Sequence, residues 1–268
     1  MPLGRQSWRG QPGNWSGAGV GSSIDFQDHR AYAPGDDPRY IHWSAYARTG
    51  QLTMKLYRAE VSPLVDVAVD VSASMSFTAE KAARMEALVA FCVESADRAG
   101  APVRVHAVSG RVVKAVPVEA VRGGDWRERL GPLTSPIAPP GPLLWRTHAL
   151  KVLISDLLFP GDPGTVLVPL AAGGGHAVVL VPALAAEAEV PSMGNLELVD
   201  CESGARRHQR IDEALAERYR TAYARHFSLW SDAARRRGVT FARVACEGEL
   251  ATVFGGEARL NGAVEING

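Results

Sequence analysis

The sequence predicts an α/β protein with a doubly wound, mostly parallel sheet and a β-rich N-terminal extension. Two observations lead to this fold class. The apolar runs 65–69, 151–156 and 176–181 contain few polar residues, as expected for strands buried on both faces. They alternate along the chain with amphipathic segments, above all 80–99 and 211–237, and strands that alternate with helices form parallel sheets.

Length and composition limit the class of protein. A chain of 268 residues is long enough for one large α/β domain with an appendage. Its 29 basic and 29 acidic residues balance, which argues against a nucleic-acid partner, because such binding needs clustered Lys and Arg. No apolar run reaches the roughly 18 residues of a membrane span, and the N-terminus lacks the apolar centre of a signal peptide. We therefore expect a cytoplasmic protein without a membrane span.

The chain before the first buried strand falls into two segments. Residues 1–23 are rich in Gly, Ser and Arg and have no periodic pattern, so we expect a flexible N-terminal segment. Residues 24–63 show short alternations, with a tight turn at 33–38 and a strand at 52–57, and form a β-rich segment. The main domain then covers residues 64–268.

Each element of the main domain has its own sequence signal. The helix 80–99 carries apolar residues at helical spacing and stops at Gly100, and the helix 211–237 is amphipathic. The turn Ser109-Gly110 predicts a hairpin between strands at 103–108 and 111–118, and the turn Ser203-Gly204 predicts one between 196–199 and 206–209. The remaining predicted elements are, in chain order, a strand at 65–69, a loop over 131–149, a strand at 151–156, a short helix at 164–172, and strands at 176–181 and 240–246.

The most informative motif is Asp70-Val71-Ser72-Ala73-Ser74, which follows directly on the strand 65–69. It places one carboxylate and two hydroxyls where a buried strand opens into a loop, and these are the hard oxygen ligands that Mg²⁺ prefers. A second acid, Asp156, ends the strand 151–156. Because the carboxyl ends of parallel strands share one edge of a sheet, Asp70 and Asp156 are expected to converge there on one ion.

The same residues also have an interpretation without a metal. In that interpretation Ser72, Ser74 or Ser76 caps the helix that follows, and Asp70 interacts favourably with its N-terminal dipole. Asp156 would likewise cap a helix further along the chain. The sequence by itself leaves both interpretations open.

The motif and the second acid together resemble the von Willebrand factor A domain, a fold with Rossmann-type topology. The metal-ion-dependent adhesion site of that family combines Asp-x-Ser-x-Ser with a Thr from a later loop and an Asp at the end of a further strand. Asp70, Ser72 and Ser74 match the first element, and Asp156 matches the last. The resemblance places the threonine in the loop before 151–156, which offers Thr134 and Ser135. Thr134 is the candidate, and the Gly-Thr-Asp usual in relatives is absent.

A narrower resemblance covers nearly the whole chain. Residues 28–50 are similar to the signature R-x-Y-x-P-G-D-D-x-R-x-I-D-W-x-x-x-A-R of the bacterial domain-of-unknown-function-58 (DUF58) family, with His42 where the family normally has Asp. The Asp-x-Ser-x-Ser motif and the region around Gly204, like the family's Asp-x-Glu-x-Gly, follow in the same order. The resemblance implies a cytoplasmic, von Willebrand A-like protein with no established enzymatic activity. Such proteins are commonly encoded beside MoxR-type AAA+ ATPases and are thought to act in chaperone-like maturation or assembly of other proteins.

The charges of the signature alternate in sign across a Pro-Gly turn, which is typical of bidentate pairs between Arg and carboxylate. Trp43 of the signature would supply a large apolar anchor. We expect either a structural network that pins this segment onto the sheet domain, or a docking surface for a partner. The residues of this network are Arg30, Asp36, Asp37, Arg39, Trp43 and Arg48.

These observations predict a non-enzymatic protein-interaction module with Mg²⁺ or Mn²⁺ at an adhesion site. Ser72 and Ser74 would hold the ion directly, and Asp70 and Asp156 directly or through water. An open coordination position would then accept a Glu or Asp of a protein partner. Two alternatives remain: a scaffold whose metal site is degenerate, and a metal-dependent hydrolase.

A hydrolase would need a general base beside the metal-activated water. His148 and His176 are the histidines near the predicted strands 151–156 and 176–181, and neither lies in a recognisable catalytic motif.

Overall fold

The computed structural model describes residues 11–20, 26–62, 64–131, 133 and 143–254. The chain divides into two compact units: the described residues before 63 form the smaller unit, and those after 63 form the larger unit. Each unit is described by itself.

The smaller unit contains a three-stranded antiparallel sheet in the order β1-β3-β2. The strand predicted at 52–57 is confirmed within β3. Residues 11–20, expected to lack regular structure, instead form β1, because antiparallel pairing depends on backbone hydrogen bonds and does not require alternating side chains. The elements of this unit are β1 (Gln11–Val20), β2 (Phe26–Ala31), the 3-10 helix η1 (Pro38–Tyr40), α1 (Trp43–Thr49) and β3 (Thr53–Ser62).

The larger unit is built on a six-stranded sheet in the order β11-β8-β7-β4-β5-β6. Neighbouring strands from β11 to β5 run parallel, and only β6 is antiparallel to its neighbour within the described sheet. The prediction of an α/β protein with a mostly parallel sheet is therefore confirmed. The strands are β4 (Val65–Asp70), β5 (Val103–Ser109), β6 (Val112–Val116), β7 (Leu150–Ile154), β8 (His176–Ala183) and β11 (Val239–Ala245).

The order of the strands reverses at β4. After β4 the chain adds β5 and β6 on one side, and then returns to add β7, β8 and β11 on the other. The carboxyl ends of β4 and β7 therefore lie next to each other at the point where the winding changes direction. In open α/β sheets this is where ligands bind.

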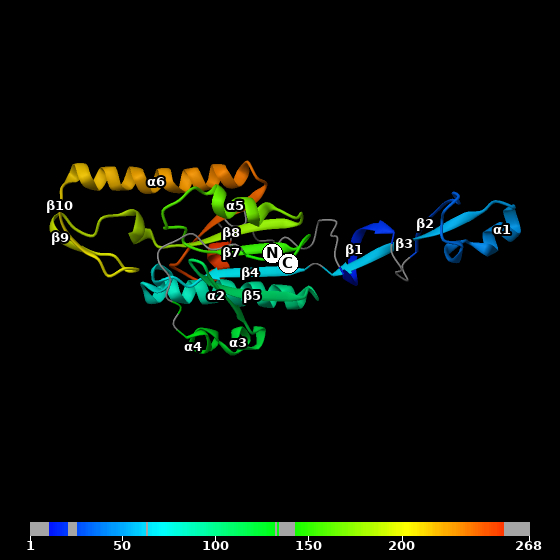
Figure 1. Cartoon of the computed structure of the whole chain (residues 1–268), viewed down its shortest axis with the longest axis horizontal. Helices are drawn as coiled ribbons and strands as arrows, with labels where there is room; N and C mark the ends of the chain where they lie inside the picture. Colours follow the sequence, from blue (N-terminus) through cyan, green and yellow to red (C-terminus); the bar gives the residue numbers. More distant parts are fainter. Residues whose placement is uncertain (1–10, 21–25, 63, 132, 134–142, 255–268) are drawn as a thin grey trace. The chain divides into compact units, whose positions relative to one another are not determined.

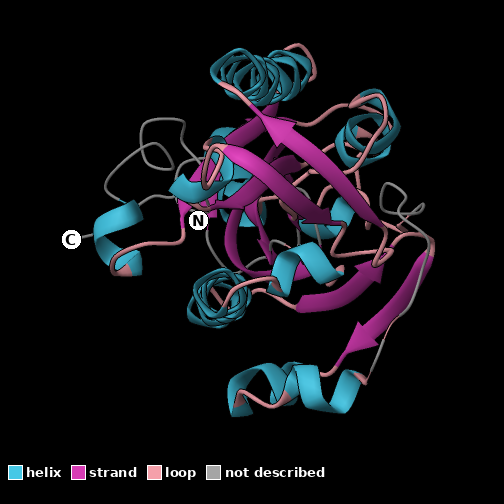
Figure 2. Cartoon of the chain, turned by 90° about the vertical axis from the view of Figure 1, so that its left-hand side faces the viewer, coloured by secondary structure: helices cyan, strands magenta, loops and turns pink. Residues whose placement is uncertain are grey.

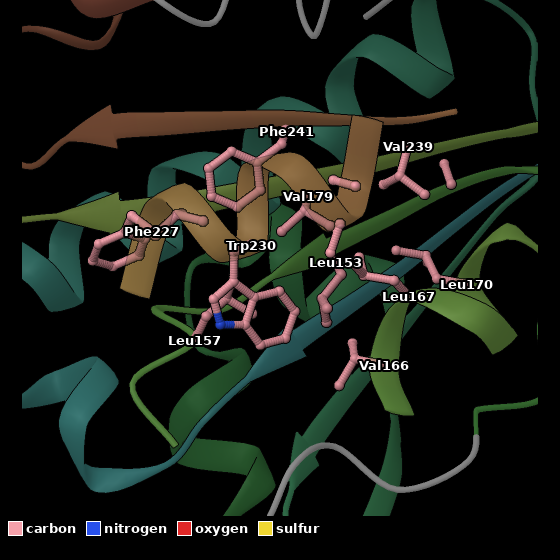
Figure 3. Close-up of a cluster of buried hydrophobic side chains, with 14 of the residues drawn as sticks. Leu153, Leu157, Val166, Leu167, Leu170, Val179, Phe227, Trp230, Val239 and Phe241 are labelled. Carbon is pink, nitrogen blue, oxygen red and sulfur yellow. The ribbon is translucent and has the colours of Figure 1, made fainter. Parts of the chain in front are cut away.

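Helices cover both faces of this sheet (Figures 1 and 2). The long helix α2 (Ala79–Arg98) packs on one face, and α5 (Gly164–Ala171) and α6 (Glu213–Arg235) pack on the other. On the second face Trp230 lies among apolar side chains of the sheet and of α5, including Leu153 and Leu167 (Figure 3). Burial of these side chains fixes α6 against the strands.

Most predicted elements of the larger unit are confirmed within a few residues. The predicted strand 111–118 ends early, at Val116, because Pro117 follows and becomes the N-cap of α3 (Val118–Gly123). The helix predicted from 211 begins after Asp212, whose side chain accepts a hydrogen bond from the Leu215 N–H. Four short helices were not predicted, because they are too short for a clear helical period: α3, α4 (Trp126–Leu130), η3 (Ala185–Ala188) and α7 (Leu250–Phe254).

A separate two-stranded hairpin, β9 (Gly194–Val199) with β10 (Arg206–Ile211), confirms the turn predicted at Ser203-Gly204. Across the described ranges, we find no helix with the length and apolar character needed to cross a bilayer.

Candidate functional site

Asp70 is the last residue of β4, and its carboxylate is almost completely buried. One carboxylate oxygen accepts a hydrogen bond from the Ser72 N–H at 2.9 Å, and the other accepts one from the Ser155 hydroxyl at 2.8 Å. These contacts turn the chain sharply after the strand. They also tie the end of β4 to the end of β7.

Ser72 comes directly before the short 3-10 helix η2 (Ala73–Ser76) and Ser74 lies within it, and their hydroxyl oxygens are 3.2 Å apart. The interpretation in which Ser72 or Ser74 caps the following helix is wrong. Ser72 precedes η2 but makes no side-chain capping hydrogen bond, and the N-cap of α2 is Thr78, which accepts from the Lys81 N–H at 3.2 Å. Neither hydroxyl is therefore used to cap a helix.

Asp156 lies just beyond β7, buried to the same degree as Asp70. The sequence prediction that both acids share one edge of the sheet is confirmed, because the Asp156 N–H contacts the Met75 sulfur of η2 at 3.2 Å. Asp156 does not cap α5, whose N-cap is Pro163. Thr134, the candidate threonine ligand, lies outside the described residues.

Lys81 also belongs to this site, although it was not predicted from the sequence. Its ammonium group is 2.7 Å from a carboxylate oxygen of Asp156 and 2.5 Å from one of Glu187, and its side chain is 2% exposed. A signal was present in the sequence, because Lys81 falls on the same helical stripe as Met85, Leu88 and Cys92. A lysine within the apolar stripe of a helix indicates a buried acidic partner.

The electrostatics of the site reflect an excess of negative charge. Burial, followed by the charge of Asp156, raises the pKa of Asp70 to about 6. Burial alone would lower the pKa of Lys81, but the charges and hydrogen bonds of Asp156 and Glu187 outweigh burial and raise it. The ammonium group therefore stays charged and neutralises one acid, while Asp70 has no cationic partner among the described residues.

Glu202 is a second residue of the site whose position was not predicted from the sequence. It lies in the turn between β9 and β10, and its carboxylate accepts a hydrogen bond from the Ser74 N–H at 2.7 Å. This contact joins residues 128 positions apart in the chain. An acid from the hairpin therefore lies directly at one of the two candidate serine ligands.

The donor set suits a hard divalent cation. Asp70, Ser72, Ser74 and Asp156 supply carboxylate and hydroxyl oxygens, and the raised pKa of Asp70 marks a charge that a cation would stabilise. Within the described ranges no three His, Cys, Asp or Glu side chains form a metal-binding group. In this donor set the hydroxyls of Ser72 and Ser74 would stand beside the carboxylates of Asp70 and Asp156.

The two histidines considered as general bases lie elsewhere. His148 precedes β7 and His176 begins β8, so both lie at the amino ends of parallel strands, whereas Asp70 and Asp156 lie at the carboxyl ends. The hydrolase hypothesis loses both of its candidate bases. A different histidine, His226 of α6, comes nearer, with Nε2 2.9 Å from the Leu157 carbonyl oxygen.

In the smaller unit the charged signature forms local pairs. Arg30 makes a bidentate contact with Asp36, with distances of 2.7 and 2.5 Å, and Asp36 also accepts from the Ala33 N–H. Asp37 pairs with Arg39 at 2.6 Å. The bidentate pairing is therefore confirmed for these residues, but Arg48 differs, because its Nε donates to the Ser44 carbonyl.

Trp43 does not act as a buried anchor within its unit. Its side chain is 58% exposed, and it contacts the edge of Tyr46 with ring centroids 6.3 Å apart. Within the described residues, Tyr46 is also among the exposed large hydrophobic residues. The two rings lie one helical turn apart on α1, and both side chains are exposed.

We expect Trp43→Ala to change the free energy of unfolding by no more than about 0.5 kcal/mol, because the substitution leaves no cavity. Urea unfolding followed by circular dichroism measures this. The matched control in the same unit is Met54→Ala, where a buried side chain is removed and a loss of about 2–5 kcal/mol is expected. A loss of that size for Trp43→Ala would mean that the ring is buried after all.

Comparison with known proteins gives the family. The family model described as a protein of unknown function, DUF58, matches residues 28–126, which include both the charged signature and the Asp70–Ser74 motif. Uncharacterized proteins Mb1516 of Mycobacterium bovis and Rv1480 of Mycobacterium tuberculosis are each 31% identical over 215 residues. Each alignment covers 74% of this chain and 67% of the relative.

Solved structures give a more distant likeness. An aerotolerance-related membrane protein from Bacteroides fragilis aligns with a TM-score of 0.40 at 13% identity, and the conserved hypothetical protein BatB from Bacteroides thetaiotaomicron with 0.39 at 14%. Both alignments cover 76% of this chain and all of the other. The sequence matches carry the assignment, and on their strength the chain belongs to the DUF58 family of proteins of unknown function.

Proposed function

We propose that this protein is a non-enzymatic, metal-dependent protein-binding module. Mg²⁺, or Mn²⁺ in its place, would be held by Ser72 and Ser74 directly and by Asp70 and Asp156 directly or through water. A carboxylate of a protein partner would complete the coordination. Such a site corresponds to the metal-ion-dependent adhesion site of von Willebrand A-like domains with Rossmann-type topology.

One observation carries this proposal. The two serines and the two buried acids meet at the edge of the sheet where the strand order reverses, and the serine hydroxyls are not used as helix caps. A buried acid whose pKa is raised to about 6 is costly to keep charged unless a cation compensates it. If a divalent ion binds here, the two serines and the two acids all serve as its ligands.

For the partner we propose a MoxR-type AAA+ ATPase of the same cell, with the pair acting in the cytoplasm in chaperone-like assembly or maturation of client proteins. The support for this step is membership of the DUF58 family, whose members are commonly encoded beside such ATPases. The exposed rings of Trp43 and Tyr46 offer a second contact surface within the family signature.

The test is a binding assay between the ATPase and this protein at constant Mg²⁺, so that the ATPase keeps its own nucleotide-bound metal. We expect Ser74→Ala to lower the affinity at least about tenfold, a loss of about 1.4 kcal/mol. Ser76→Ala is the matched control, because Ser76 lies in the same turn and its hydroxyl contacts only the Ala73 carbonyl among described groups. Equal binding by both variants would contradict a role of the metal in partner binding.

A second function is favoured by one specific contact. Because Lys81 already neutralises Asp156, the protein could act as a scaffold that binds its partner without a metal. In that case Mg²⁺ leaves the melting temperature unchanged, and Ser74→Ala binds the ATPase as well as the wild type does. Under the leading proposal, Mg²⁺ raises the melting temperature, and Ser74→Ala binds the ATPase more weakly than the wild type does.

A further inference from the structure

The contact between Glu202 and Ser74 is the starting point of a further inference. Ser74 is a candidate metal ligand through its hydroxyl, and its N–H holds the carboxylate of Glu202 at 2.7 Å. In the proposed function a partner presents an acidic side chain at this site. The chain therefore already places an acid of its own where the partner's acid is expected.

The turn that carries Glu202 is well defined. One carboxylate oxygen of Asp200 accepts hydrogen bonds from the N–H groups of Glu202 and Ser203, both at 2.8 Å, and these bonds lower the pKa of Asp200. Gly204 closes the turn in a left-handed conformation with φ +70°, and its N–H donates to the Asp200 carbonyl. The Asp-x-Glu-x-Gly pattern thus has a physical role for each residue: Asp200 and Gly204 shape the turn, and Glu202 makes the contact.

The hairpin itself is suited to move. Its two strands pair only with each other in the described sheets, and most of their residues are exposed. Apart from the Glu202 contact, the hydrogen bonds found for the described hairpin residues run within the hairpin. An isolated two-stranded hairpin is marginally stable, so loss of one contact at its tip can release it.

We propose that Glu202 is an internal ligand that closes the site. Its carboxylate takes the place of the partner's acid, and the hairpin must move away before a partner can bind. This inference rests on the proposed function and adds its regulation: the site has a closed and an open state. A ligand that binds only the open state then binds more weakly, in proportion to the fraction of molecules that are open.

The test uses Mn²⁺ as the metal and glutarate, a small dicarboxylate, as the probe for the partner's acid. Water-proton relaxation reports how many water molecules exchange on bound Mn²⁺. We compare the wild type, Glu202→Ala, and Glu197→Ala as a control on the same hairpin, where Glu197 contacts Arg206. We expect glutarate to displace water from Mn²⁺ on Glu202→Ala at a concentration at least about fivefold lower than on the wild type or the control.

The outcomes separate the two proposals. If Mn²⁺ binds all three proteins and glutarate displaces its water at the same concentration in each, the closing role of Glu202 is wrong and the metal proposal stands. If Mn²⁺ binds none of them, the metal proposal fails, and this inference fails with it. Hydrogen exchange without metal adds an independent check: amides of 194–211 must exchange faster in Glu202→Ala than in the wild type, and equal rates would show that the contact does not hold the hairpin.

Discussion

The Lys81→Met variant is expected to lose about 3–5 kcal/mol of unfolding free energy at neutral pH. Methionine fills the same space but removes the ammonium group, which leaves the buried carboxylate of Asp156 and the half-buried carboxylate of Glu187 close together without a counter-ion. An unpaired buried charge is among the largest penalties that a single substitution can cause. Urea unfolding measures the loss directly.

Mg²⁺ should recover part of this loss, if the ion binds beside Asp156. The control is Arg98→Met at the other end of α2, where the surface pair with Glu94 is worth at most about 0.5 kcal/mol. Equal unfolding midpoints for Lys81→Met and the wild type would contradict the buried pair.

The Asp70→Asn variant is expected to be more stable than the wild type when no metal is present and the pH is above about 6. In the folded protein the pKa of Asp70 is raised from 3.8 to about 6 by burial and by Asp156. The folded state therefore binds this proton more tightly than the unfolded chain does, and the wild type loses stability as the pH rises through that interval. Asparagine has no charge to develop, and the gain is at most about 3 kcal/mol.

Thermal melts in a chelator between pH 4 and 7.5 test this. The two proteins should melt alike at the acid end and diverge toward neutral pH. Added Mg²⁺ should then reverse the order at about one thousand times its dissociation constant, where it stabilises the wild type by about 4.1 kcal/mol and does not stabilise the variant. A difference that stays constant across this pH range would show that Asp70 does not titrate as described.

The placement of Asp70 and Asp156 at one edge of the sheet could be predicted because it follows from topology. Once 65–69 and 151–156 are read as buried parallel strands, their carboxyl ends must share an edge, and no side-chain detail is needed. The structure confirms this placement through the bond between Ser155 and Asp70. The order of helices and strands was also predictable, because each long element has a clear sequence pattern.

Lys81 and Glu202 could not be placed in the same way. The register of α2 on the sheet decides that the Lys81 ammonium group meets Asp156, and local pattern does not determine that register. The contact of Glu202 depends on where a separate hairpin folds back, across 128 residues of sequence. Both are tertiary contacts of polar groups, whereas sequence periodicity reports mainly which face of an element is apolar.

Calorimetric titration of the folded wild type with Mg²⁺ tests the central claim most directly. The account predicts saturable binding at one site, and it predicts that Asp70→Ala, checked for folding by circular dichroism, no longer binds. Ser76→Ala should bind like the wild type, because that hydroxyl is outside the proposed donor set. Absence of Mg²⁺ binding to both the wild type and Glu202→Ala, with each protein folded, would contradict the account.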